Sequence, residues 1–270
     1  MFRRAARRLV YRGLPLAFRL RTAALACHWG AARWSLALIG DLAQRDPAEF
    51  HAFLWRHHLA AARTFSATRS LDELVPSRRL LVQDILAALR VQALSVDSVL
   101  DAGCSSGFLL RHFECALRPA PQFLIGFDLD AAALAAGQAE LTARGSRCRL
   151  FPGDLRQPPQ FNPLTPAHAG FDLVVCAGVL RYFSEAAART AVSWLMRQTR
   201  GLLVLTGPAS RGCDNGTLTA SQVLPHASFA HNFDAMIAKA QGRIVFRRWQ
   251  GAQLCGGQTV YFVFARPDQF

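Results

Sequence analysis

The fold is decided by a stretch before the middle of the chain, residues 98–113, which reads SVLDAGCSSGFLLRHF. Its first residues form a short apolar run that predicts a buried strand, and the pattern from Phe108 onward predicts a helix. Small residues stand between them at alternate positions, Gly103, Ser105 and Gly107, and let the backbone approach a ligand closely. The amides at the start of the helix are available to polar or anionic groups. The sequence therefore predicts a ligand site at this strand-to-helix turn.

Downstream, short apolar runs alternate with helical patterns. The predicted strands are residues 98–101, 123–128, 148–151, 171–176 and 202–205. The predicted helices are residues 107–117, 131–143, 185–199 and a last one near 228–240. A proline-rich loop replaces the helix at 152–170, and residues 243–249 and 259–265 predict an antiparallel hairpin at the end. This alternation is typical of an α/β fold, in which helices cover both faces of a parallel sheet.

Two acids follow the second and third predicted strands. Asp128 ends the second strand 21 residues beyond Gly107, where a carboxylate can accept hydrogen bonds from both hydroxyls of a ribose. Asp154 follows the third strand in the stretch FPGDL and lies at the same edge of the sheet, within reach of an adenine amino group. A nucleoside is therefore the expected ligand.

The glycine spacing argues against a dinucleotide. Only Gly103 and Gly107 are glycines in the turn, whereas a dinucleotide fingerprint needs G-x-G-x-x-G. Asp101 stands where the first glycine would be; it would repel a pyrophosphate and attract the ammonium of an amino acid. The chain also lacks the lysine-containing loop that holds nucleoside triphosphates.

The motif D-x-G-x-S-x-G, from Asp101 to Gly107, resembles the E/D-x-G-x-G-x-G motif of class I S-adenosylmethionine-dependent methyltransferases, with serine at the middle glycine. Asp128 resembles the acid of that family that holds the ribose, and residues 153–155 and 171–183 resemble its adenine-contacting segment and its fourth strand. The acids are spaced by 27 and 26 residues, and the resemblance covers residues 96–265. It implies a seven-stranded, mostly parallel Rossmann-like sheet in the order 3-2-1-4-5-7-6.

The resemblance implies S-adenosyl-L-methionine as the cofactor. The residues that it assigns to cofactor binding are Asp101, Gly103, Cys104, Ser105, Gly107, Asp128, Leu129, Asp154, Leu155 and Ala177. The sulfonium methyl group is already activated, so the main task of the protein is to position the acceptor. A general base is needed only for a protonated hydroxyl or amine. Tyr182, His226 and His231 are candidates for that base, and we assign the role to none of them.

Residues 1–90 predict a helical extension ahead of a methyltransferase domain at 91–270. The extension holds fifteen arginines against six acids, whereas the whole chain has a formal net charge of +13. Residues 1–14 predict a basic amphipathic helix, which fits either attachment to an anionic membrane surface or a solvated terminal helix. An arginine-rich start is also compatible with an organelle transit peptide. A second helix, expected from Asp46, would make the extension a possible lid.

The chain contains no apolar run long enough to span a membrane, and its seven scattered cysteines have no zinc-ligand spacing. We therefore expect a cytoplasmic protein without a metal, in peripheral contact with the membrane at most. The expected reaction is O- or N-methylation of a small molecule or a lipid-linked compound. We do not expect a nucleic-acid partner, because no basic motif is interleaved with aromatic residues. The alternatives are an inactive methyltransferase-like binding protein, a nicotinamide oxidoreductase and an RNA or protein methyltransferase.

Overall fold

A computed structural model describes residues 76–159, 170–210, 212–224, 228–254 and 258–268. The predicted basic arm and the helix expected from Asp46 lie outside the described residues, as does most of the proline-rich loop. The division of the chain near residue 90 stays a prediction. No helix of the described part is long and apolar enough to cross a membrane.

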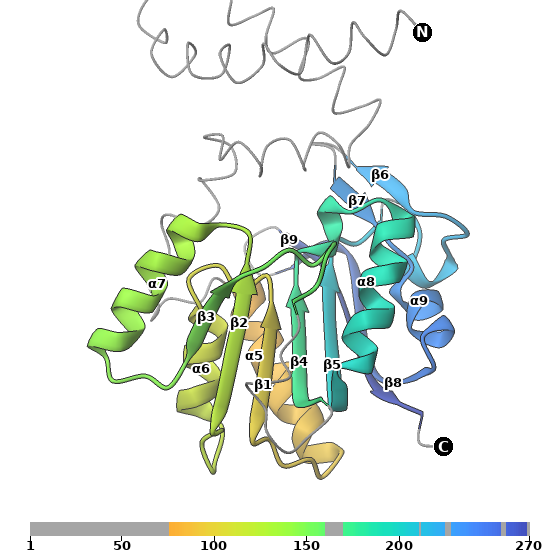
Figure 1. The fold of residues 1–270 in the computed structure, drawn as a ribbon. Helices are drawn as coiled ribbons and strands as arrows, with labels where there is room; N and C mark the ends of the chain where they lie inside the picture. Colours follow the sequence, from red (N-terminus) through yellow and green to blue (C-terminus); the bar gives the residue numbers. More distant parts are fainter. Residues whose placement is uncertain (1–75, 160–169, 211, 225–227, 255–257, 269–270) are drawn as a thin grey trace, which may run out of the picture.

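One seven-stranded sheet organises the described chain, in the order β3-β2-β1-β4-β5-β9-β8 (Figure 1). Its strands are β1 (Ser98–Ala102), β2 (Phe123–Asp128), β3 (Arg149–Pro152), β4 (Phe171–Ala177), β5 (Thr199–Gly207), β8 (Gly242–Leu254) and β9 (Gln258–Pro267). The first five strands run parallel, and β9 pairs antiparallel with β5 and with β8. The predicted order 3-2-1-4-5-7-6 is confirmed, because β9 and β8 are the seventh and sixth strands of this sheet in chain order. The predicted terminal hairpin is confirmed as well.

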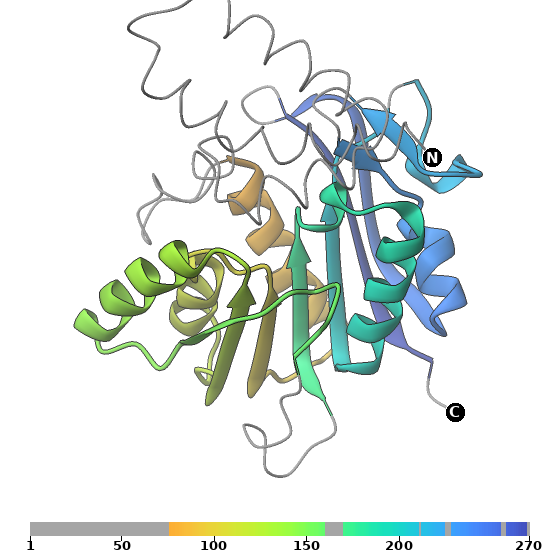
Figure 2. The same cartoon turned by 45° about the horizontal axis from the view of Figure 1, so that its top comes forward.

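Helices cover both faces of the sheet (Figures 1 and 2). On one face, α5 (Pro76–Val91) and α6 (Phe108–Ala116) pack against β1, β4 and β5, and Leu141 of α7 (Ala131–Ala143) joins them. On the other face, α8 (Glu185–Arg197) and α9 (Phe233–Lys239) pack against the same strands. The central strands are buried on both sides, which explains why their sequences read as continuous apolar runs rather than alternating ones.

The segment after β5 differs from the expectation. A helix near 228–240 is predicted, but the helix α9 begins only at Phe233. The residues before it form β7 (Ser228–Ala230), which pairs with β6 (Gln222–Leu224) in a separate two-stranded sheet. Strands of three residues leave almost no periodicity in a sequence, so the local pattern does not reveal them.

Helix α5 packs against the sheet and lies within residues 1–90, the range predicted for the helical extension. Its buried side chains, among them Leu81 and Ile85, share a hydrophobic cluster with Val99 of β1. The carboxylate of Asp84 accepts hydrogen bonds from Nε and Nη2 of Arg248 in β8, at 2.8 and 2.9 Å. This bidentate contact ties α5 to the edge strand of the sheet.

Candidate cofactor site

The turn between β1 and α6 has the backbone shape that its small residues predict. Gly103 and Gly107 have positive φ angles of 84° and 80°. A Cβ atom on Gly103 would lie 2.1 Å from Cγ2 of Val179, and one on Gly107 would lie 2.9 Å from Cδ2 of Leu150. Only glycine fits these positions without strain, because both the angle and the available space exclude a side chain.

Ser105 stands where the resembled motif has a glycine, yet its backbone adopts the left-handed conformation that glycine favours. It has a φ of 53°, a left-handed conformation that costs a non-glycine residue of order 1 kcal/mol. In this conformation its amide donates a hydrogen bond to Oδ2 of Asp128 at 2.8 Å. Oδ1 of Asp128 accepts from the amide of Asp130 at 2.9 Å. The turn and the acid at the end of β2 are therefore joined in one arrangement.

The start of α6 carries no side-chain cap. Its N-cap residue is Gly107, whereas α7, α8 and α9 are capped by the side chains of Asp130, Ser184 and Asn232. Backbone amides in the first turn of a helix lack partners within the helix, and a side chain, water or ligand must satisfy them. The uncapped end lies at the turn that the sequence assigns to the ligand.

Asp101 is the most perturbed acid of the site. It is 1% exposed, and its Oδ1 has no hydrogen-bond partner among the described residues. Burial raises the pKa of Asp101 to about 7; the charge of Arg78 opposes the shift and that of Asp128 adds to it. A buried carboxylate oxygen without a donor is costly unless a ligand supplies one.

Arg78 is a site residue that the sequence analysis missed. It stands in the first turn of α5, and its Nη2 donates to the carbonyl oxygen of Ala177 at the end of β4, at 2.8 Å. Its guanidinium also approaches Gly178, where a Cβ atom would lie 3.2 Å from Nη2. The sequence does contain one sign of its role. Arg78 is a cation in the first turn of a helix, where the helix dipole disfavours positive charge, and that turn holds no acid to offset it.

The remaining predicted residues take different places. Leu129 is 39% exposed beside Asp128, whereas the side chains of Cys104 and Leu155 are buried in the protein. Burial raises the pKa of the Cys104 thiol. Asp154 is paired with Arg156, whose Nη2 lies 2.7 Å from its Oδ2. Cys104 and Leu155 can therefore offer only backbone groups, and Asp154 offers a carboxylate already engaged by a neighbouring cation.

Of the three candidate bases, His231 is engaged in the fold. Its Nε2 lies 2.8 Å from the carbonyl oxygen of Leu180, which can only accept, so Nε2 carries the proton. Nδ1 then accepts from the hydroxyl of Ser221 at 2.7 Å. Burial lowers the pKa of His231 and keeps the ring neutral. Tyr182 lies in the short helix η1 (Leu180–Tyr182) after β4, and His226 lies outside the described residues.

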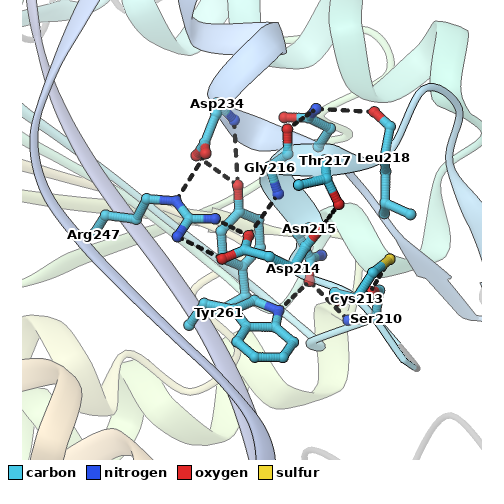
Figure 3. Close-up of polar contacts among 12 residues, drawn as sticks. Ser210, Cys213, Asp214, Asn215, Gly216, Thr217, Leu218, Asp234, Arg247 and Tyr261 are labelled. Atoms are coloured by element: carbon cyan, nitrogen blue, oxygen red, sulfur yellow. Dashed lines mark hydrogen bonds and ion pairs between the residues drawn. The ribbon is translucent and has the colours of Figure 1, made fainter.

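The loop after β5 is held by a polar cluster, which Figure 3 shows. Arg247 of β8 binds Asp214 of the loop and, through Nε at 2.8 Å, Asp234 of α9. The hydroxyl of Tyr261 also donates to Asp234, at 2.7 Å. Burial and this contact raise the pKa of Tyr261, while Arg247 lowers the pKa of Asp214. The loop after β5 is thus fixed to the terminal hairpin and to α9.

Comparisons with known proteins agree with the fold. Residues 99–200 match the family model of a methyltransferase domain. A crystal structure of magnesium protoporphyrin IX methyltransferase from Synechocystis with bound S-adenosylmethionine superposes with a TM-score of 0.55 at 15% identity, covering 83% of this chain and 98% of that one. An S-adenosylmethionine-dependent methyltransferase from Clostridium acetobutylicum gives a TM-score of 0.52 at 12% identity, covering 69% and 90%. A search of curated proteins found no match.

The fold and the matched domain define the class: this is a Rossmann-like, class I methyltransferase fold. The stretch that matches a methyltransferase domain, residues 99–200, contains the turn at Asp101 and the acids Asp128 and Asp154. Among the described residues, no group of three His, Cys, Asp or Glu side chains is arranged to hold a metal ion.

Proposed function

We propose that the protein transfers the methyl group of S-adenosylmethionine to a small-molecule acceptor, and that the turn at Asp101 holds the amino-acid end of the cofactor. The observation that carries this assignment is the buried Oδ1 of Asp101, which has no donor among the described residues. An ammonium group supplies such a donor. Arg78, which acts on Asp101 from α5, supplies the positive charge that the neighbouring carboxylate of the cofactor requires.

The ribose and the adenine of the cofactor fit the residues that follow β2 and β3, at the same edge of the sheet as Asp101. Asp128 is partly exposed, and its oxygens accept hydrogen bonds from the amides of Ser105 and Asp130; a carboxylate has about four acceptor sites, so it can also accept from the ribose hydroxyls. Leu129 offers an exposed apolar side chain beside the adenine. Gly153, Asp154 and the backbone of Leu155 follow β3, where they would border the adenine amino group. The residues present therefore fit the cofactor from the amino acid to the base.

S-adenosylmethionine supplies an activated methyl group, and the chain then positions the acceptor in line with it and excludes water. Ala177 ends β4 directly beside β1, at the point where the methyl group would lie. A small acceptor is supported by the printed name of a structural neighbour, magnesium protoporphyrin IX methyltransferase, which acts on a small molecule.

The test begins with calorimetry using S-adenosylmethionine, S-adenosylhomocysteine and NAD. Both sulfur nucleosides should bind and NAD should not. Asp128→Ala should weaken the binding of S-adenosylhomocysteine by more than about 1 kcal/mol, because it removes the ribose contacts. Asp268→Ala is the matched control, since it removes an exposed carboxylate far along the chain. A cell extract supplied with deuterated methyl donor then identifies the acceptor by mass spectrometry. Equal affinity of the two variants would contradict the assigned ribose site.

We also propose that residues 1–14 bind an anionic membrane surface. The support is in the sequence: Arg4, Arg8 and Arg12 recur every four residues, opposite a face that holds Phe2 and Leu9. A helix of this kind buries its apolar face at the interface while its arginines contact lipid phosphates. Such an arm would bring the site to a lipid-linked acceptor.

A further inference from the structure

Arg181 lies at the acceptor side of the proposed site. It belongs to η1, which directly follows β4, and its neighbour Val179 packs against Gly103 of the cofactor turn. Nη2 of Arg181 lies 3.3 Å from Oγ of Ser228 in β7, and its guanidinium lies 5.6 Å from the ring centre of Tyr182. The side chain thus sits between η1 and the β6–β7 hairpin, which Figure 1 shows above the carboxyl ends of β4 and β5.

Within the described ranges, the guanidinium of Arg181 has no carboxylate beside it, unlike two comparable arginines. Its Nε is buried and has no hydrogen-bond partner in the described part of the chain. Arg189 and Arg200 also bury one unpaired nitrogen, but each is bound to a carboxylate, of Glu185 and Asp172 respectively. Arg181 has no carboxylate partner among the described residues.

An unpaired, half-buried guanidinium is unfavourable. Burial removes water from the charge, and only an anion with good geometry repays that cost. Two nitrogens in a fixed fork, here Nε and Nη2, match the two oxygens of a carboxylate or a phosphate. The neighbouring hydroxyl of Ser228 and the ring of Tyr182 add a polar contact and an apolar wall. These features give the guanidinium at η1, just beyond the end of β4, the groups that suit a small anion.

We propose that the methyl acceptor carries an anionic group, a carboxylate or a phosphate, and that Arg181 binds it and so determines which acceptors are methylated. This inference rests on the proposed function, because it takes the edge of the sheet at β4 as the acceptor side. The subsite would hold the anion while the methylated atom, elsewhere on the same small molecule, faces the cofactor. A neutral analogue would leave Arg181 unpaired and would bind more weakly.

The experiment uses the full chain saturated with S-adenosylhomocysteine. Ligand-observed NMR titrations measure the affinities of benzoate, phenyl phosphate and the neutral analogue benzamide. The wild-type protein should prefer at least one anionic probe over benzamide by about tenfold, and whichever anion is preferred distinguishes carboxylate from phosphate. Arg181→Gln should abolish that preference. Arg181→Lys, which keeps the charge without the fork, should retain part of it.

Arg197→Gln is the matched control. Arg197 is exposed in the last turn of α8, whereas Arg181 lies in η1 before that helix, so the change removes the same charge elsewhere and should leave the preference intact. Affinity for S-adenosylhomocysteine, measured for every variant, reports both folding and the cofactor site. Loss of that affinity in the wild-type protein would contradict the proposed function itself. Intact affinity with equal binding of charged and neutral probes, or with no probe bound, would overturn the anion subsite alone, as would a preference that Arg181→Gln leaves unchanged.

Discussion

The affinity for S-adenosylhomocysteine should fall as the pH falls below 7, because Asp101 must be ionised to bind the ammonium group. With the pKa of Asp101 at about 7 in the free protein, about three quarters of the protein carries the charge at pH 7.5 and about 3% at pH 5.5. If only the ionised form binds, the affinity drops by about 25-fold between these values, or about 2 kcal/mol. Below pH 7 the free-energy change should approach about 1.4 kcal/mol per pH unit.

The direction in which the pKa of Asp101 is shifted determines how its ionisation changes the stability of the folded protein. The pKa of Asp101 is raised in the folded protein above its ordinary value of 3.8, so the folded state binds more protons than the unfolded state between those values. This one group therefore destabilises the cofactor-free protein as the pH rises from about 4 to 7. Ligand binding reverses the effect, because the bound ammonium favours the ionised acid. The stabilisation by S-adenosylhomocysteine should accordingly be larger at pH 7.5 than at pH 5.5.

Calorimetry in two buffers of different ionisation enthalpy measures both the affinity and the protons released. At pH 5.5 the wild-type protein should release close to one proton on binding, and at pH 7.5 only a fraction of one. Asp101→Asn should bind weakly at both values and release almost none. Burial also raises the pKa of Asp128, so this second acid can contribute a smaller part of the pH dependence. The reasoning fails if the wild-type affinity is flat over this range or if Asp101→Asn keeps the full dependence.

Two further changes test the turn and the terminal arm. Gly103→Ala forces a side chain onto a φ of 84° and against Val179; urea denaturation should show a loss of roughly 3 kcal/mol in the free energy of unfolding. Gly145→Ala, at a φ of 62° with nothing within 4 Å of the new atom, should cost only roughly 1 kcal/mol, and equal losses would contradict the packing argument. Deletion of residues 1–14 should abolish pelleting with liposomes that contain anionic lipid and leave affinity for S-adenosylhomocysteine unchanged; pelleting that survives the deletion would refute the membrane proposal.

Local patterns predicted the central elements because each is specified by its own residues. The strand at 123–128 and the helix at 131–143 have the predicted bounds, since apolar runs and helical spacing are contained within them. The turn between β1 and α6 was also predictable, because its small residues stand at alternate positions between a strand pattern and a helix pattern. The order of the strands, by contrast, came from the resemblance to a family, as no pattern within a strand specifies its neighbour.

The parts that escaped prediction depend on contacts between distant residues. The β6–β7 hairpin has strands of three residues, and it is tied to η1 by the hydrogen bond of His231 to Leu180, 51 residues apart. The residues at 228–240 have a helical pattern in the sequence. In the structure, the start of that segment forms β7 and pairs with β6 instead, and the helix begins only at Phe233. The same hydrogen bond removes His231 from the set of free bases, which its place in the sequence could not indicate.

Arg78 extends the proposed cofactor site beyond the stretch that matches the methyltransferase domain. Arg78 comes before the stretch at 99–200 that matches the family, on a helix whose other contacts reach the far end of the chain. Asp84 of that helix is bound by Arg248, 164 residues away on the edge strand β8, so the terminal hairpin helps to fix the helix that presents Arg78 to Asp101. The pKa of Asp101 depends on that placement, because Arg78 is the cation that lowers it. Any change that loosens β8 from α5 should therefore weaken the amino-acid end of the cofactor site before it disturbs the ribose end, which β1 and β2 hold between themselves.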